Sequence, residues 1–261
     1  MMSNTVYVVL ENQESLSNEI AQAFYSKLLD LQSKKEKIFI ALSGGSTPKL
    51  FLQKFTHSVD LSKIEWGKVH IFQVDERWVP KASEESNFKM LSENLLSSLN
   101  IPEKNIHPMP TVEFRPEKAK EIYQNEIFDV FKLPKTSLPS FDLLLLGLGD
   151  DMHTASIFPS LNGSKALSTN DIVEIPYIEK FKTLRVTLSM KIINNSEEIW
   201  FLVSGANKAQ AFQTVLEKNI SINEAPAIGV NPVKGKVIWF LDKKVINNLR
   251  NTVKIEKNYK I

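Results

Sequence analysis

Short apolar runs of strand length alternate along this chain with segments whose apolar residues recur at helical spacing. The spacing of three or four positions predicts helices within residues 16–31, 88–99 and 209–216, and Pro116 suits the start of a further helix that runs to about residue 131. Runs that are apolar on both faces are typical of buried strands; they cover residues 6–10, 38–42, 69–74, 141–146, 199–203 and 237–241. This alternation predicts an α/β fold with a mostly parallel sheet and helices on both faces.

No linker divides the pattern. The proline-containing stretch 133–139 is the best candidate, but another series of strands and helices follows it directly. We therefore expect one α/β domain over residues 1–261. In such folds ligands bind beyond the carboxyl ends of the strands, so the segments that follow the strands are the places to search for chemistry.

The net charge and the absence of cysteine exclude several classes of function and of site. The 32 basic and 30 acidic residues leave a net charge of +2, which gives no electrostatic reason to expect nucleic acid or a membrane surface as a partner. Cysteine is absent, which excludes disulfides, thiolate metal sites and a cysteine nucleophile. No targeting segment and no run of roughly 20 apolar residues is visible. We expect a cytoplasmic protein that acts on a small molecule.

The segment after the strand at 38–42 reads Ser43-Gly44-Gly45-Ser46-Thr47-Pro48. Two glycines let backbone N–H groups approach a ligand, and we expect Thr47 as a helix N-cap with Pro48 at the first helical position. Free N–H groups at a helix N-terminus bind anions, phosphate above all. A well-capped turn between strand and helix explains the same residues, so this segment alone leaves both interpretations open.

The segment after the strand at 69–74 begins with Asp75-Glu76-Arg77. A pair of carboxylates beside a guanidinium can orient a polar substrate or supply a base. A surface ion pair in a loop is the simpler alternative. Farther on, Ser86-Asn87 precedes a predicted helix and is most simply its cap.

The segment after the strand at 141–146 runs from Gly147 to Ser156 and nearly matches the dinucleotide fingerprint G-x-G-x-x-G. Met152 stands where the third glycine belongs, and we reject that interpretation. His153 follows an acid by two positions and is a candidate general base near neutral pH, with a purely structural histidine as the alternative. A metal site built from Asp150, Asp151 and His153 is less well supported, because such clusters usually need a further histidine. We expect no metal.

Two cations follow later in the chain. Arg185 opens the segment Arg185-Val186-Thr187-Leu188, and Lys208 follows Ser204-Gly205-Ala206-Asn207. We expect Lys208 in the first turn of the next helix, where it opposes the helix dipole unless an anion is bound. No G-x-S-x-G elbow is present, so a serine-triad esterase is not expected.

Taken together and in this order, these segments resemble the glucosamine-6-phosphate isomerase/6-phosphogluconolactonase family, and within it the lactonases. The resemblance extends over nearly the whole chain. It is carried by Ala41 to Pro48, Val74 to Pro80, Ser86-Asn87, Leu146 to Gly149 with His153 to Ser156, Arg185 to Leu188, and Ser204 to Ala209.

The resemblance implies a Rossmann-like fold shared with glucosamine-6-phosphate deaminases and ribose-5-phosphate isomerases. It implies hydrolysis of 6-phospho-D-glucono-1,5-lactone to 6-phosphogluconate, without metal or organic cofactor. We expect a monomer or small homo-oligomer. His153 is implied as the base that activates water. Asp75 is implied beside it in the catalytic centre, lining the sugar together with Arg77. The implied phosphate clamp consists of Ser43, Gly44, Gly45, Ser46, Thr47, Arg185 and Lys208.

Two other functions fit parts of the pattern. A deaminase–isomerase acting on an amino-sugar phosphate would share the phosphate loop and the histidine turn, and a non-catalytic sugar-phosphate sensor could use the same fold. The chain also departs from the family, in which glycine commonly precedes the catalytic histidine, because Met152 stands there. If that position requires a positive φ, methionine costs on the order of 1–3 kcal/mol of strain, and glycine would relieve it.

Overall fold

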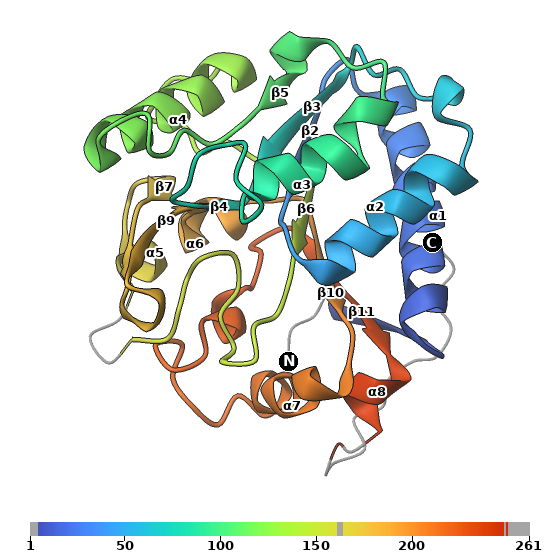
Figure 1. Cartoon of the computed structure of the whole chain (residues 1–261), viewed down its shortest axis with the longest axis vertical. Helices are drawn as coiled ribbons and strands as arrows, with labels where there is room; N and C mark the ends of the chain where they lie inside the picture. Colours follow the sequence, from blue (N-terminus) through green and yellow to red (C-terminus); the bar gives the residue numbers. More distant parts are fainter. Residues whose placement is uncertain (1–4, 161–163, 248, 250–261) are drawn as a thin grey trace.

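A sheet of seven parallel strands forms the centre of the protein, in the order β1-β11-β10-β6-β2-β3-β5 (Figure 1). This computed structural model describes residues 5–160, 164–247 and 249. The strands are β1 (Thr5–Leu10), β2 (Ile38–Leu42), β3 (Val69–Gln73), β5 (Ile106–His107), β6 (Leu143–Leu146), β10 (Glu198–Val203) and β11 (Lys236–Asp242). All six strands predicted from the sequence form. The sequence missed β5, which has only two residues and so offers no periodicity to detect.

Helices cover both faces of this sheet, as predicted (Figure 1). Successive side chains of a strand point to opposite faces, and β10 shows the result. Phe201 packs into one apolar core with α4 (Pro116–Phe131), α6 (Met190–Ile193) and α7 (Ala209–Glu217). Trp200 and Leu202 pack into a second core with α1 (Gln13–Lys34), α2 (Ser46–Ser58) and α3 (Asn87–Asn94).

Local signals set the ends of two long helices. Asn12 caps α1, accepting hydrogen bonds from the N–H groups of Glu14 and Ser15, both at 3.0 Å. Pro116 opens α4 as predicted, and Lys132 ends it in the left-handed conformation with φ of 54°.

The shorter helical elements are η1 (Leu61–Lys63), η2 (Leu96–Ser98), η3 (Glu103–Asn105), α5 (Lys165–Ser168), η4 (Glu179–Phe181), η5 (Ala206–Lys208), η6 (Pro226–Gly229) and α8 (Lys243–Ile246). No helix within the described part of the chain is long and apolar enough to cross a membrane.

A second, antiparallel sheet lies beside the carboxyl ends of the central strands, and the sequence did not predict it. Its order is β4-β9-β7, and β8 also pairs with β9. Its strands are β4 (Asp75–Arg77), β7 (Val173–Glu174), β8 (Tyr177–Ile178) and β9 (Thr183–Leu188). The register sets Asp75 opposite Thr187 and Arg77 opposite Arg185, so this sheet brings two predicted site segments together.

Candidate active site

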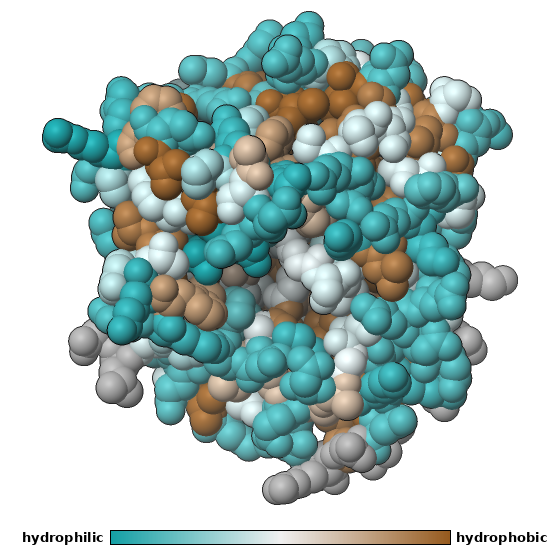
Figure 2. All heavy atoms as spheres, in the orientation of Figure 1, coloured by the Kyte–Doolittle hydropathy of each residue, from teal (hydrophilic) through white to brown (hydrophobic). Residues whose placement is uncertain are grey.

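The loops that follow β2, β3, β6 and β10 meet around a cavity of about 190 Å³. Parallel strands present their carboxyl ends at one edge of the sheet, which is why segments so far apart in sequence converge here. Every predicted site residue lines the cavity except Arg185; the lining comprises Ser43, Gly44, Gly45, Ser46, Thr47, Pro48, Asp75, Arg77, Asn87, Gly147, Leu148, Gly149, His153, Ala155, Leu202, Ser204 and Lys208. Figure 2 shows this face of the molecule hollowed near its centre, with hydrophilic side chains around the hollow.

The glycine loop opens helix α2 differently from the prediction. Gly45 is the N-cap residue, α2 begins at Ser46, and Pro48 is its third residue. The prediction of Thr47 as N-cap is therefore wrong. Gly45 has a φ of 119°, a conformation that L side chains rarely adopt, and this lets the chain turn into the helix two residues earlier than expected. Ser46, Thr47 and Pro48, which form the first turn, line the cavity.

Two polar side chains, those of Ser43 and Asn87, pack at this loop. The hydroxyl of Ser43 is buried and, with that of Ser17, is one of two buried side-chain oxygen or nitrogen atoms in the described residues that have no hydrogen-bond partner. Asn87 packs so closely on Gly44 that a Cβ atom there would lie 1.9 Å from its Oδ1. The sequence suggested Ser86-Asn87 only as a cap. Ser86 does cap α3, but Asn87 lines the cavity and was missed as a site residue.

The two adjacent carboxylates face different surroundings. Glu76 accepts hydrogen bonds from the backbone N–H groups of Asn87 and Phe88, both at 2.8 Å, so it ties β4 to the start of α3. Asp75 lines the cavity and accepts a hydrogen bond of 2.7 Å from the Ser156 hydroxyl. Burial raises the pKa of Asp75 above its ordinary value. The structure therefore leaves Asp75 as the carboxylate available to a ligand.

A tight turn carries His153 to the cavity. The N–H of Gly149 donates to the carbonyl of His153 and the N–H of Met152 donates to the carbonyl of Gly149, both at 2.9 Å. This is the bond pattern of a three-residue connection that ends in a left-handed residue. Met152 has a φ of 65°, so the condition under which the sequence predicted strain is met. A Cβ atom on Gly149 would lie 2.0 Å from Nδ1 of His153, and only glycine leaves room for the ring.

Two neighbours orient the His153 ring. Its Nδ1 contacts Oδ1 of Asp151 closely, and Phe158 stacks on its face with 4.1 Å between ring centroids and 23° between planes. The other oxygen of Asp151 pairs with Nζ of Lys180 at 2.7 Å. Hydrogen bonds from His153 and Lys180 hold the pKa of Asp151 far below its ordinary value, despite partial burial, so this carboxyl group is an anion. A neutral His153 that donates from Nδ1 to this anion keeps a lone pair on Nε2.

The two predicted cations lie in different places. Lys208 ends η5 and is the N-cap of α7, one residue before the first turn in which it was expected. It lines the cavity and forms an ion pair with Asp150. Arg185 lies above the ring of Phe181, 5.3 Å from its centroid, and does not line the cavity. Burial and the nearby Arg77 lower the pKa of Arg185. The structure brings Lys208 to the glycine loop but not Arg185.

Asp150 and Asp151 each form an ion pair with a lysine and do not face a shared metal position. Asp150 pairs with Lys208, and Asp151 pairs with Lys180. Among the described residues, no three histidine, aspartate or glutamate side chains come together as metal ligands do.

Comparison with known proteins identifies the family. The family model described as "Glucosamine-6-phosphate isomerases/6-phosphogluconolactonase" matches residues 11–239. A 6-phosphogluconolactonase of Synechocystis sp. is 35% identical over 242 residues, which are 93% of this chain and 97% of that protein. The crystal structure of the Thermotoga maritima 6-phosphogluconolactonase superimposes with a TM-score of 0.78 at 32% identity, covering 92% of this chain and 100% of that one. A monomeric glucosamine-6-phosphate deaminase, at 17% identity and a TM-score of 0.77 over 93% of this chain and 99% of that one, shares the fold. With its characteristic loops gathered around one cavity, this chain belongs to the glucosamine-6-phosphate isomerase/6-phosphogluconolactonase family.

Proposed function

We propose that this chain is a lactonase that hydrolyses 6-phospho-D-glucono-1,5-lactone to 6-phospho-D-gluconate, the lactone step of the oxidative pentose phosphate pathway. The observation that carries the proposal is that the glycine loop and His153 line one cavity, while Asp151 contacts Nδ1 of His153 from outside that lining. The 6-phosphogluconolactonases among the relatives support the same substrate class.

The phosphate is proposed to bind at the glycine loop. Backbone N–H groups at the start of α2 and the ammonium of Lys208 suit a dianion. The buried Ser43 hydroxyl, which has no partner, would gain one from a phosphate oxygen. Arg185 lies outside the cavity lining, so we assign it a smaller and indirect part in the clamp, through the charge it adds next to Arg77.

The proposed chemistry is general-base hydrolysis. Nε2 of neutral His153 takes a proton from water while the water oxygen attacks the lactone carbonyl carbon. When the tetrahedral intermediate collapses, the bond from that carbon to the ring oxygen breaks, and the imidazolium returns the proton to the ring oxygen. Water is the co-substrate, and no redox or group-transfer cofactor is needed. A lactone is an activated ester, so positioning and one base suffice.

Asp75 and Arg77 are proposed to position the sugar. Both line the cavity, and Asp75 is held by Ser156 and buried, so its orientation is set before the substrate arrives. A carboxylate that accepts hydrogen bonds from sugar hydroxyls would place the carbonyl carbon in front of His153. The monomeric or small homo-oligomeric state and the cytoplasmic location remain predictions from the sequence, which light scattering and cell fractionation would test.

The decisive assay follows freshly generated lactone with and without the protein, against spontaneous hydrolysis. We expect acceleration by the parent, and a loss of about 10²-fold or more in His153→Ala, with both proteins melting at similar temperatures. Release of ammonia from glucosamine 6-phosphate, with no effect on the lactone, would instead favour the deaminase–isomerase alternative. Full activity in His153→Ala would refute the assignment of the base.

A further inference from the structure

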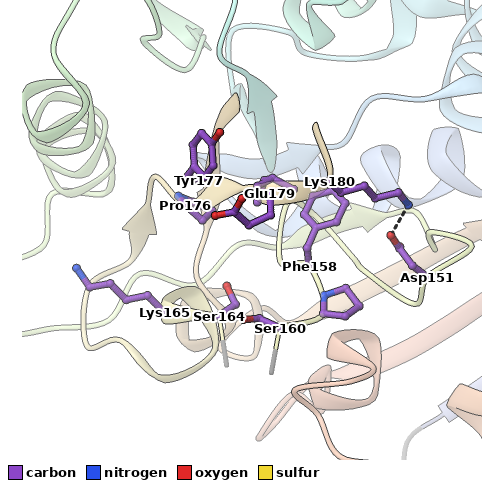
Figure 3. A pocket seen from close by; sticks show the side chains of 11 residues that line it. Asp151, Phe158, Ser160, Ser164, Lys165, Pro176, Tyr177, Glu179 and Lys180 are labelled. Atoms are coloured by element: carbon purple, nitrogen blue, oxygen red, sulfur yellow. Dashed lines mark hydrogen bonds and ion pairs between the residues drawn. The ribbon is translucent and has the colours of Figure 1, made fainter. Parts of the chain in front are cut away.

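The turn η4, which connects β8 to β9, contacts the His153–Asp151 pair by two routes. Through Lys180 it reaches the second oxygen of Asp151, as the dashed line in Figure 3 shows. Through Phe181 it packs against Phe158 in a T-shaped pair, with 5.6 Å between ring centroids, and Phe158 in turn stacks on His153. One short turn therefore supports both the carboxylate and the aromatic ring that orient the histidine.

Lys180 lies on the far side of this pair from the proposed substrate. It lines a separate cavity of about 390 Å³, together with Asp151 and Phe158 (Figure 3). His153 does not line that cavity, and Lys180 does not line the one that contains the glycine loop. Lys180 is thus placed to act on the reaction through Asp151 rather than by touching the substrate.

The contact between Lys180 and Oδ2 of Asp151 restricts the orientation of the Asp151 carboxylate. A carboxylate hydrogen-bonded only through Oδ1 can rotate and offer either oxygen, whereas one whose Oδ2 is also held presents Oδ1 in a single direction. That direction fixes the ring of His153 and the tautomer with the proton on Nδ1, which leaves Nε2 to act as base. The side chain of Lys180 is 58% exposed and that of Asp151 is 28% exposed, so the pair adds little to overall stability. Its effect should appear in the orientation of the base.

We propose that Lys180 is a positioning residue for the lactonase reaction, holding Asp151 so that His153 keeps the orientation and tautomer needed to activate water. This inference rests on the proposed function, because it takes His153 as the base.

The test uses Lys180→Met and Lys180→Arg in the full-length protein. We expect Lys180→Met to lower kcat about 10-fold, because a small misplacement of a catalytic group can cost up to ~10²-fold, while KM stays within 2-fold of the parent. Lys180→Arg should restore most of kcat, because a guanidinium can also pair with the carboxylate. The matched control is Lys165→Met, which removes the same charge from the same cavity at a side chain that is 72% exposed, and it should leave kcat and KM unchanged. A rise in KM at unchanged kcat would place Lys180 on the substrate and overturn the proposal.

A double-mutant cycle asks whether Lys180 acts through Asp151. In an Asp151→Asn background, Lys180→Met should change kcat by less than 2-fold, because the carboxylate it holds is gone. An equal loss of kcat in both backgrounds would overturn the proposal.

A spectroscopic measurement distinguishes failure of this inference from failure of the proposed function. Nitrogen NMR of His153 in the free protein needs no substrate, and it should show the Nδ1–H tautomer in the parent and a growing share of the Nε2–H tautomer in Lys180→Met. If the parent fails to hydrolyse the lactone but the tautomer shift appears, the positioning contact stands and the proposed function fails. If the tautomer is the same in both proteins, the positioning role fails whatever the reaction is.

Discussion

The backbone strain of the turn that precedes His153 can be tested by comparing two substitutions of Met152. Its φ of 65° places an L side chain in the left-handed region, which costs roughly 1–2 kcal/mol relative to ordinary backbone. Its side chain is partly buried against the core that contains Phe201. Removing that packing costs on the order of 1 kcal/mol, about half the value for full burial. Met152→Gly alone should therefore leave stability almost unchanged, because relief of strain offsets the lost packing and the added freedom of the unfolded chain.

Comparison of Met152→Gly with Met152→Ala removes the packing contribution, since both substitutions delete the same side chain. Alanine retains the left-handed strain, whereas glycine removes it and loses about 0.5–1 kcal/mol to chain entropy. Met152→Gly should thus be more stable than Met152→Ala by about 0.5–1 kcal/mol, which corresponds to a difference in Tm of roughly 1–4 °C for a protein of this size.

Thermal and urea unfolding of both variants would measure this difference, with lactone hydrolysis as a check that the turn still presents His153. The matched control is Glu121, an exposed residue in the interior of α4, where the order should reverse and Glu121→Gly should be less stable than Glu121→Ala by about 1 kcal/mol. If Met152→Ala were as stable as Met152→Gly, the left-handed strain assigned to this turn would be refuted.

Two further predictions concern the anion site and a buried histidine pair. Lys208→Ala should raise KM and weaken inhibition by inorganic phosphate by roughly 10- to 100-fold, the loss of a charge-assisted contact of about 1.5–3 kcal/mol. Arg185→Ala should do so much less, because Arg185 does not line the cavity; unchanged KM in both variants would exclude them from the clamp. Nδ1 of His70 lies 3.0 Å from Nε2 of His107, and burial, with the neighbouring His107, lowers the pKa of His70 from 6.5 to about 4. The unfolded chain therefore binds this proton at higher pH than the folded protein does, and stability should fall by about 2–4 kcal/mol as pH drops from 6.5 towards 4. His70→Phe should flatten that slope in urea unfolding between pH 4.5 and 7, and equal slopes would refute the reasoning.

The sequence alone determined the fold class and the places where chemistry could lie. Burial on both faces leaves a run such as Ile38 to Leu42 apolar throughout, and a helix leaves a three-or-four-residue spacing, so both are readable from neighbouring residues. The parallel arrangement then sends the loops at Ser43, Gly147 and Ser204 to one edge of the sheet. Their convergence therefore needed no knowledge of individual contacts.

Only the tertiary structure decided which polar side chains meet. The neighbouring residues in the sequence do not distinguish the roles of Asp75 and Glu76. They differ in the structure because Asp75 accepts a hydrogen bond from Ser156, whereas Glu76 accepts one from the start of α3. No sequence pattern indicated a role for Lys180, since its partner Asp151 lies 29 positions away in the chain. Side-chain pairing in loops depends on backbone brought in from distant parts of the chain, and no periodicity encodes it. The two-residue strand β5 was too short to show a period, and the small sheet formed by β4, β7, β8 and β9 escaped prediction because strands of two to six residues gain their stability from their partners.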